Sequence, residues 1–275
     1  MKILLTGGTG FIGTAVLDRL VAAGHQVTAV VRSQSSSLQV EKAGAVGVIG
    51  DLFDAGWLAS ELAHHDAGIH TAAGSDQRDA ELNTAVIDAA IESFGGTDKP
   101  FVLTGGIWTY GSNGSIVETD EPQPIPLTGW RVEGEQRLLD SDVNATVVQP
   151  GIVYGHGAGI PSMLAGWGSV PGTGEQHWTT VHVDDLADLY VSALEGPGGT
   201  FVGTNGQNPT VAELGEALGL APEGDQPTLD RLGPFGEALL LDQQATGEKA
   251  QRTFAWTPSR PSLVEELQSG YSAQD

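Results

Sequence analysis

A glycine-rich segment near the start of the chain constrains the fold more than any other feature. The run Thr6-Gly7-Gly8-Thr9-Gly10-Phe11-Ile12-Gly13 follows an apolar stretch at 3–6 and opens a segment of helical spacing at 12–23. Glycines in this order permit a tight turn, a close approach of the backbone to a pyrophosphate, and close packing of helix on strand. The sequence therefore predicts a dinucleotide-binding site made by Gly7, Thr9, Gly10, Phe11, Ile12 and Gly13.

The first half of the chain alternates short apolar runs with segments of helical period. We predict strands at 3–6, 27–31, 47–49, 68–70, 101–103 and 146–149, and helices at 12–23, 57–63, 79–94 and 130–140. This alternation is typical of βα units around a parallel sheet. We therefore expect an α/β fold, namely a Rossmann-type doubly wound parallel sheet with a small C-terminal substrate lobe.

After Gln149 the local composition changes, because Gly and Pro become frequent at positions 151–174 and 196–206. The spacing at 180–194 predicts a strand turning into a helix with Asp184 as its N-cap, and short helices are expected at 210–218 and 262–267. We predict a dinucleotide-binding domain at 1–155, completed by about 176–205, and interleaved with it a smaller substrate-binding lobe at 156–275.

Charge and composition exclude several classes of partner. The chain has 12 Lys and Arg against 35 Asp and Glu, a formal charge of −23, so nucleic acid and anionic membranes would repel it. It contains no cysteine, which removes disulfides and thiolate metal sites, and no metal site is expected from its histidines. No stretch of 18 apolar residues and no leader-like segment is found, so we expect a cytoplasmic protein.

The end of the second predicted strand bears on the kind of dinucleotide. An acid there would bond the ribose 2′-hydroxyl, whereas an arginine would pair with a 2′-phosphate. The strand at 27–31 ends in Arg32-Ser33 and carries no acid at that point. We therefore predict NADP(H) rather than NAD(H), bound in part by Arg32 and Ser33, the alternative being that Arg32 is an ordinary solvated side chain.

Further motifs make the sequence similar to the extended branch of the short-chain dehydrogenase/reductase superfamily, the NAD-dependent epimerase/dehydratase group. They are Gly50-Asp51-Leu52, His70-Thr71-Ala72-Ala73, Pro150-Gly151-Ile152-Val153-Tyr154-Gly155, Val181-His182-Val183-Asp184-Asp185 and Phe254-Ala255-Trp256-Thr257-Pro258. The resemblance implies that the cofactor contacts Asp51, Leu52, Thr71, Ala72, Ala73, Pro150, Gly151, Ile152 and Val153. Family members often pair through the helices at 79–94 and 130–140, so a homodimer is a candidate assembly.

The positions of the family's catalytic tetrad are altered in this chain. Registering the Tyr-x-x-x-Lys pair puts its lysine at Arg131 and its tyrosine at Leu127. The usual serine position falls on Gly106, and the asparagine position falls on Asp79. This pattern resembles the atypical subgroups of the superfamily, in which fold and cofactor site persist while the tetrad does not.

Other residues are candidates for the missing roles. Tyr110 is the candidate proton donor, and its alternative role is packing. Arg131 either holds the nicotinamide ribose, pairs with a substrate carboxylate or is a surface helix residue. Asp79 is either a base, a partner of Arg131 or an acid at a helix start. Aromatic walls of the substrate pocket, or else core packing, are predicted for Trp108, Trp130 and Trp178.

These features together predict a function and two alternatives. The leading hypothesis is an NADP(H)-dependent oxidoreductase acting on the carbonyl or alcohol of a small molecule, with the proton supplied by Tyr110 or bound water. The first alternative is an epimerase or dehydratase that retains its cofactor. The second is a sensor that binds NADP(H) without turning it over. No Gly-x-Ser-x-Gly segment occurs, so a hydrolase triad is not supported.

Overall fold

The computed structural model describes residues 1–74 and 78–271. The chain divides into two compact units, each built from three segments. Unit 1 consists of Met1–Gly105, Glu133–Val148 and Ala187–Thr200. Unit 2 consists of Gly106–Val132, Gln149–Leu186 and Phe201–Asp275.

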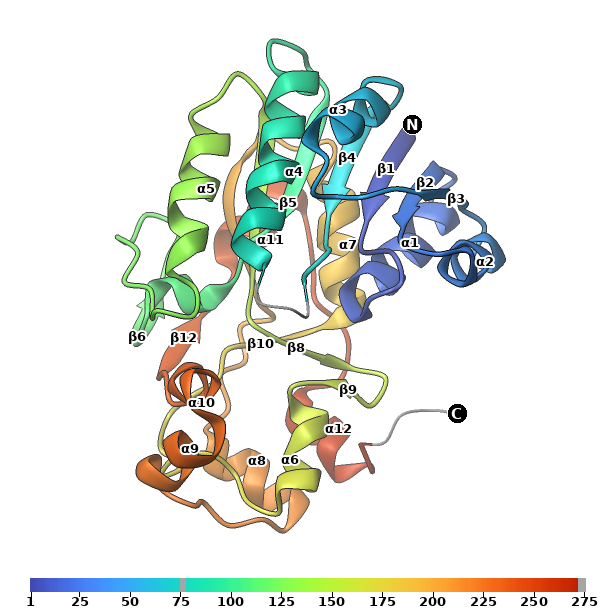
Figure 1. The fold of residues 1–275 in the computed structure, drawn as a ribbon. Coiled ribbons are helices and arrows are strands. Elements are labelled where there is room, and N and C mark those ends of the chain that lie inside the picture. The colour runs from blue at the N-terminus through green and yellow to red at the C-terminus, as the bar shows by residue number, and fades with distance from the viewer. Residues whose placement is uncertain (75–77, 272–275) are drawn as a thin grey trace. The chain divides into compact units, whose positions relative to one another are not determined.

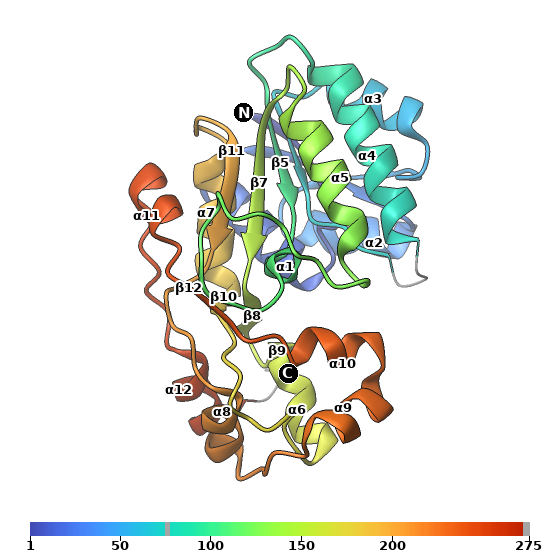
Figure 2. The ribbon, with the colours of Figure 1, turned by 90° about the vertical axis from the view of Figure 1, so that its left-hand side faces the viewer.

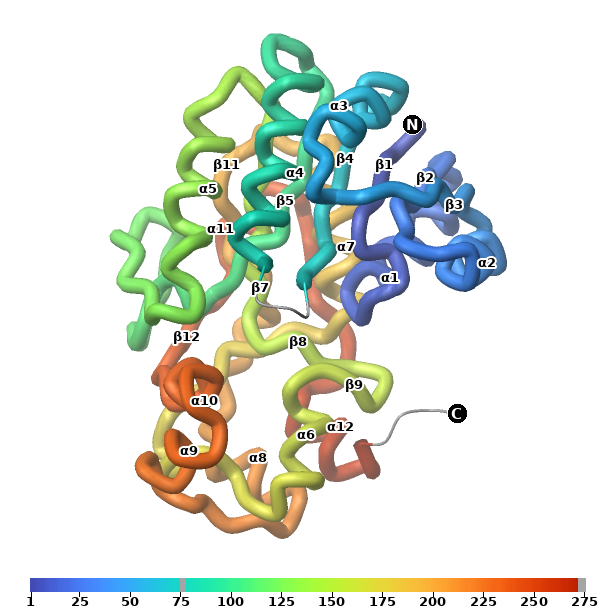
Figure 3. The backbone as a smooth tube through the Cα atoms, viewed as in Figure 1, coloured from blue at the N-terminus to red at the C-terminus, as the bar shows by residue number. Residues whose placement is uncertain are grey.

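A parallel sheet organises unit 1 (Figure 3). Within the described residues it has seven strands, in the order β11-β7-β5-β4-β1-β2-β3. Their bounds are β1 (Lys2–Thr6), β2 (Gln26–Val31), β3 (Val46–Ile49), β4 (Ala67–His70), β5 (Pro100–Thr104), β7 (Asn144–Pro150) and β11 (Gly199–Gly203). β1 pairs in parallel with both β2 and β4, so the chain order reverses at this point. The doubly wound fold predicted from the sequence is confirmed, and ligand sites of such sheets lie where the order reverses.

Helices connect these strands: α1 (Phe11–Ala22), α2 (Gln34–Lys42), α3 (Ala55–Ala63), α4 (Asp79–Phe94), α5 (Gly129–Leu139) and α7 (Val183–Ala193). The row formed by α3 and α4 covers one face of the sheet (Figures 1 and 2). On α4, Val86, Ala90 and Phe94 recur at helical spacing and are buried against Phe101 of β5. Burial of this apolar stripe, rather than helix propensity alone, holds α4 on the sheet.

Unit 2 has two small sheets, β10-β8-β9 and β12-β6, with short helices around a separate core. Tyr154, Trp178 and Leu214 are among the buried residues of that core. The bounds are η1 (Ile107–Tyr110), β6 (Asn113–Ile116), β8 (Ile152–Gly155), β9 (Ala158–Gly159), α6 (Pro161–Trp167), β10 (Thr180–His182), α8 (Val211–Leu218), α9 (Asp225–Leu232), α10 (Pro234–Leu239), β12 (Gln243–Ala245), α11 (Glu248–Phe254) and α12 (Leu263–Gln268).

The strands and helices predicted from periodicity are confirmed, with ends that move by a few residues. α2 was not predicted, because its first turn holds three consecutive serines, Ser35, Ser36 and Ser37, whose helix propensity is below that of Ala, Leu or Glu. It forms because the Ser33 hydroxyl accepts the Ser36 N–H at 3.2 Å and caps the helix. Across the described residues, every helix is too short or too polar to cross a lipid bilayer.

The prediction that Asp184 is the N-cap of its helix is wrong. α7 begins one residue earlier, at Val183, and Asp184 lies in the first turn. The cap acceptor is the ring of His182, whose Nδ1 accepts the N–H of Asp184 at 3.1 Å. β10 runs directly into α7, so the last residue of the strand takes the capping position that a loop residue would otherwise fill.

Candidate functional site

Steric requirements fix two of the four glycines in the segment 7–13, which forms the loop after β1 and the first turn of α1. Gly7 has φ +78, and a Cβ there would lie 2.5 Å from the Ala72 nitrogen. A Cβ at Gly13 would lie 2.0 Å from the Gly7 carbonyl oxygen. At Gly10 a Cβ would meet only that same oxygen, at 3.3 Å. The chain's own packing therefore demands glycine at Gly7 and Gly13 more strongly than at Gly10.

The N-terminus of α1 offers unused hydrogen-bond donors. Gly10 is the N-cap and provides no side-chain cap, while its carbonyl accepts the Thr14 N–H at 2.8 Å. Within the described residues, no acceptor is found for the N–H groups of Phe11, Ile12 and Gly13. Free donors at the positive end of a helix dipole form an anion site, and a small residue at Gly10 leaves room for the anion. The loop therefore fits the pyrophosphate of a dinucleotide.

A cavity of about 310 Å³ in unit 1 gathers the predicted cofactor residues, within the size range of small-molecule sites. Nine of its lining residues were predicted: Gly7, Thr9, Gly10, Arg32, Asp51, Leu52, Thr71, Ala72 and Ala73. These residues come from the carboxyl ends of β1, β2, β3 and β4 or from the loops that follow them. The structure therefore brings together four separate sequence motifs in one place, as ligand sites of parallel sheets require.

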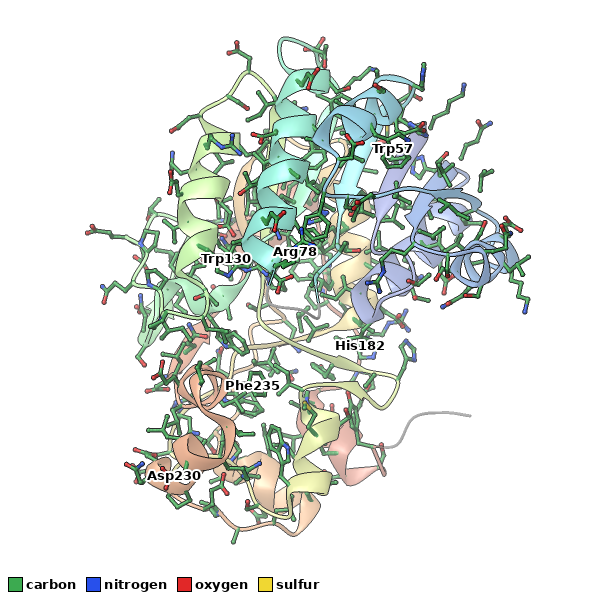
Figure 4. The ribbon with its side chains drawn as sticks, in the orientation of Figure 1. Trp57, Arg78, Trp130, His182, Asp230 and Phe235 are labelled. Carbon is green, nitrogen blue, oxygen red and sulfur yellow. The ribbon has the colours of Figure 1, made fainter. Side chains whose placement is uncertain are left out.

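Sequence reasoning missed six lining residues: Val30, Val31, Ser36, Phe53, Gly74 and Leu82. Three of them, Val31, Phe53 and Gly74, lie directly beside a predicted residue, so adjacency was the available signal for these three. Phe53, for example, follows Leu52 and lies below the guanidinium of Arg78, whose Cζ is 3.8 Å from the ring centroid. Arg78 stands at the start of α4 (Figure 4) and donates from Nε to Glu81 at 2.9 Å. The sequence spacing could not predict that Leu82 lines the cavity, because α4 reaches the cavity only through the tertiary fold.

The residues at the end of β2 differ in their surroundings. Arg32 is exposed and lines the cavity, and within the described residues it forms no ion pair with a carboxylate. Ser33 is not among the lining residues and instead caps α2. An arginine without an acidic partner is unusual in a chain with 35 acids and 12 bases. The guanidinium of Arg32 is therefore available to an anionic ligand in this cavity.

Other predicted cofactor residues belong to other elements. Phe11, Ile12 and Gly13 form the first turn of α1. Pro150 ends β7, while Ile152 and Val153 begin β8 in unit 2. Between them, the Gly151 N–H donates to the Gly203 carbonyl at 3.2 Å, and a Cβ at Gly151 would lie 2.5 Å from the Thr179 carbonyl oxygen. This glycine is thus required by packing inside unit 2.

The proposed catalytic residues lie in different settings. Tyr110 is 5% exposed in a cluster with Ile107, Ile116, Val202 and Ala245, which favours the packing alternative. Asp79 begins α4, and its carboxylate accepts the backbone N–H of Gly74, which favours the role of a helix-start acid.

Arg131 lies near the start of α5 in unit 2. Its Cζ is 4.4 Å from the ring centroid of Trp130. The Trp130 indole N–H in turn donates to the carbonyl of Leu127 at 3.0 Å. The planar guanidinium is thus stacked on an aromatic face beside the turn that holds the family's tyrosine position.

The other tryptophans have different burial. Trp178 is 2% exposed, and its indole N–H donates to the Leu239 carbonyl at 3.0 Å, which favours core packing. Trp108 is only partly buried and meets the ring of Phe235 with centroids 6.0 Å apart. Of the three predicted pocket walls, Trp108 and Trp130 therefore keep surface that a small molecule could contact, whereas Trp178 does not.

A histidine cluster in unit 2 was not predicted. Possible ligand atoms of His156, His182 and Asp184 lie within 4.8 Å of one another. Nδ1 of His182 accepts a backbone N–H, so the proton of its neutral ring is on Nε2, which lies 3.1 Å from a Glu266 oxygen. A metal would have to displace that proton and leave the ring anionic, so these residues fit a hydrogen-bond network better than a metal site. Burial lowers the pKa of His182 and favours this neutral ring.

The fold and the cavity together define a dinucleotide-binding protein of the Rossmann type. A family model described as NAD(P)H-binding matches residues 7–197. A human epimerase family protein, SDR39U1, is 30% identical over 80% of this chain and 80% of its own length. The chain belongs to this NAD(P)H-binding, epimerase-like family, within the atypical short-chain dehydrogenases/reductases.

One further sequence relative and one solved structure are similar to this chain. The 2-alkyl-3-oxoalkanoate reductase of Stenotrophomonas maltophilia is 29% identical over 88% of this chain and 81% of its own length. A crystal structure of human SDR39U1 with NADPH superposes with a TM-score of 0.75 at 23% identity, covering 98% of both chains. The structural likeness supports the fold. The sequence relatives include epimerase-family proteins and a reductase, so an oxidoreductase-type enzyme is supported.

Proposed function

We propose that this protein is an NADP(H)-dependent oxidoreductase that reduces the carbonyl, or oxidises the alcohol, of a small organic molecule. The observation that carries the proposal is Arg32, which lines the same cavity as the glycine loop and has no carboxylate partner within the described residues. The structure of human SDR39U1 with NADPH and the similarity to the Stenotrophomonas 2-alkyl-3-oxoalkanoate reductase are consistent with it.

Unit 1 offers candidate partners for the adenine, the 2′-phosphate and the pyrophosphate of the dinucleotide. The N–H groups of Phe11 and Ile12 would hold the pyrophosphate, and Arg32 would hold the 2′-phosphate. Asp51 and Leu52, as the family resemblance implies, would lie against the adenine. When bound, the nicotinamide ring of this cofactor supplies or accepts a hydride.

The chain's own contribution to the chemistry is orientation and polarity. Because Tyr110 is buried among apolar side chains, we assign the proton to bound water rather than to its phenol. Arg131, whose guanidinium is stacked on Trp130, is our candidate for holding the nicotinamide ribose or a substrate carboxylate. We assign the Asp79 carboxylate to accepting the N–H of Gly74 rather than to proton transfer.

The first test is a cofactor-binding measurement on Arg32→Ala. Loss of a charged pair with the 2′-phosphate should weaken NADPH binding about 10- to 100-fold and leave NADH binding nearly unchanged. Binding is followed by titration of NADPH fluorescence. Arg137→Ala is the matched control, because Arg137 pairs with Asp88 on neighbouring helices and does not line the cavity. Equal affinities for the two cofactors in the unaltered protein would refute the NADP(H) assignment.

The second test separates an enzyme from a sensor. The altered tetrad, with Gly106 and Leu127 at the family's hydroxyl positions, favours the sensor as the second candidate function. A reductase consumes added NADPH with some member of a carbonyl panel, whereas a sensor binds NADPH and turns over none. Copurification of bound cofactor without net NADPH consumption would instead support an epimerase or dehydratase.

A further inference from the structure

Unit 2 contains a cavity of about 510 Å³, which we call the α12 cavity, and every residue that lines it belongs to that unit. Its walls come from the turn between β8 and β9, the junction of β10 and α7, and α12 with its flanking segments. The turn contributes His156, the junction contributes His182 (Figure 4) and Asp184, and α12 contributes Glu266. A volume of this size is sufficient for a small organic molecule.

Hydrogen bonds fix the walls of the α12 cavity. The Tyr271 hydroxyl accepts the Gly155 N–H at 2.7 Å and donates to the Ala158 carbonyl, so the β8–β9 turn is held against the segment that follows α12. His156 in this turn has φ +52, a conformation that few residues other than glycine adopt, and its Nε2 lies 3.1 Å from an Asp184 oxygen. The imidazole is therefore positioned before any ligand arrives, which lowers the entropic cost of binding.

The charges that line the α12 cavity favour a cation. Its ionised side chains are three carboxylates and one guanidinium: Asp184, Glu265, Glu266 and Arg260. The imidazoles of His156 and His182 add no charge in their neutral forms. An anionic ligand would meet an excess of carboxylates, and Arg260, the cation available to pair with it among the lining residues, already has Nη2 at 3.6 Å from Asp184.

The hydrogen bonds inside the α12 cavity leave several acceptors for a ligand. Within the described residues the Glu266 carboxylate has one polar partner, the His182 Nε2 at 3.1 Å, although an ionised carboxylate has about four acceptor sites. In the neutral ring of His156, Nε2 donates to Asp184, so Nδ1 keeps a lone pair that can accept a hydrogen bond. A primary ammonium group has three N–H donors and no acceptor, so it is complementary to these groups.

The electrostatics of Glu266 point to the same kind of ligand. Burial and the negative charge of Asp184 raise the pKa of Glu266, while His156 acts in the opposite direction. A cation bound beside Glu266 would stabilise its ionised form. A metal ion fits less well than an ammonium group, because the Nε2 of His182 carries the ring proton that a metal would have to displace.

We propose that the α12 cavity binds a small organic molecule through a primary ammonium group, which is held by the carboxylates of Glu266 and Asp184 and by the imidazole of His156. The site is independent of the proposed oxidoreductase function, because none of its residues lines the cofactor cavity. Its test therefore needs neither cofactor nor turnover, and either proposal can fail without the other.

The experiment is a calorimetric titration of the full-length protein with 1,4-diaminobutane at neutral pH. Salt at about 0.15 M screens the general attraction of the acidic chain for cations, so we expect one bound diamine per chain. Glu266→Gln should raise the dissociation constant about 10- to 100-fold, because it removes the charged acceptor and keeps an oxygen for His182. Glu248→Gln is the control, because it removes the same charge from an exposed pair with Arg252 outside the cavity.

Further probes and a second variant decide the chemistry of the ligand. Methylammonium should bind more tightly than tetramethylammonium, which carries the same charge but has no N–H donor. Asp184→Asn should also weaken diamine binding and serves as the test if Glu266→Gln does not fold. Equal dissociation constants for the cavity variants and Glu248→Gln would overturn the site, because the diamine would then bind through the overall charge alone. Binding of Zn²⁺ that His156→Ala abolishes, without binding of the diamine, would overturn it in favour of a metal site.

Discussion

At the scale of single residues, glycine is present at different positions for different physical reasons. The Gly13 position has no room for a Cβ, because the Gly7 carbonyl oxygen would lie 2.0 Å away. Gly106 is at the family's serine position, and a Cβ built there meets nothing within 4 Å. Its φ of −179 is extended backbone that any residue adopts. Gly13 is therefore required by the fold, whereas the absence of a side chain at Gly106 is not enforced by packing.

This contrast gives a matched pair of substitutions. Gly13→Ala should lower the free energy of unfolding by about 3 kcal/mol and abolish NADPH binding, because the glycine loop must move to make room. Gly106→Ala should change stability by less than about 0.5 kcal/mol. Urea unfolding with NADPH titration measures both effects. If Gly13→Ala is as stable as the unaltered protein, the close approach of loop and helix is not required.

At the scale of elements, the junction of β10 and α7 depends on one ring. His182 ends β10, caps α7 through Nδ1, and meets Glu266 of α12 through Nε2. It is buried among titratable and charged neighbours: His156, Asp184, Asp185, Arg260 and Glu266. Burial is the largest effect and lowers the pKa of His182 from its ordinary value of 6.5.

The pH dependence of stability follows from that shift. Well above pH 6.5 the ring is neutral in both states and adds no slope. Below it, the unfolded chain takes up a proton that the folded ring resists, so the free energy of unfolding falls by at most about 1.4 kcal/mol per pH unit. His182→Asn keeps a capping oxygen and cannot titrate, so its loss of stability between about pH 6.5 and 5 should be smaller. Urea midpoints across this range measure the difference.

A second histidine variant serves as the control for these urea midpoints. His64→Gln alters an exposed histidine at the C-terminal end of α3 and should leave the slope unchanged. Burial also raises the pKa of Glu266, which contributes the opposite sign at its own pKa and is present in both proteins. Parallel slopes for His182→Asn and the unaltered protein would show that His182 titrates normally in the folded state.

The start of a second element, α8, is stabilised by a side-chain cap. Thr210 accepts the Glu213 N–H at 3.2 Å, and the Glu213 carboxylate accepts the Thr210 N–H at 2.8 Å, which closes a capping box on α8. Thr210→Ala should lower the free energy of unfolding by about 1 kcal/mol. Thr173→Ala, in a loop before β10, is the comparison. Equal thermal midpoints for the Thr210 variant and the unaltered protein would contradict the capping contribution.

These elements also show how far the sequence carries a prediction. Apolar runs located the strands of unit 1, and the sharp start and end of α4 followed from its spacing. The cavity residues next to β1, β2, β3 and β4 could be predicted because carboxyl ends of parallel strands meet at one edge. The capping ring of His182 could not, because only the direct join of β10 and α7 puts it there. The ring contacts of Phe235 with Trp108 and Trp167 join segments distant in sequence, and no local pattern marks such contacts.

At the scale of the whole molecule, the charge of −23 destabilises the folded state by like-charge repulsion and also disfavours anionic partners. Its arginines are mostly paired at exposed positions, such as Arg252 with Glu248, and such pairs contribute little. The excess of carboxylates therefore repels itself in the folded state more than in the expanded unfolded chain. A polyanion that binds an anionic dinucleotide also needs a local positive potential, which Arg32 and the N-terminus of α1 supply.

The repulsion predicts a stabilising effect of salt. Raising NaCl from about 0.01 M to 0.2 M shortens the screening length from about 30 Å to less than 10 Å, so repulsion between carboxylates weakens sharply over this range. The thermal midpoint should rise by at least about 2–4 °C, which corresponds to about 1 kcal/mol for a chain of this size. Most of the rise should be complete by about 0.2 M, because screening saturates whereas exclusion of salt from the surface continues to molar concentrations. Scanning calorimetry across this range decides the point: a midpoint that falls with salt would mean that the ion pairs outweigh the excess of 35 acids over 12 bases.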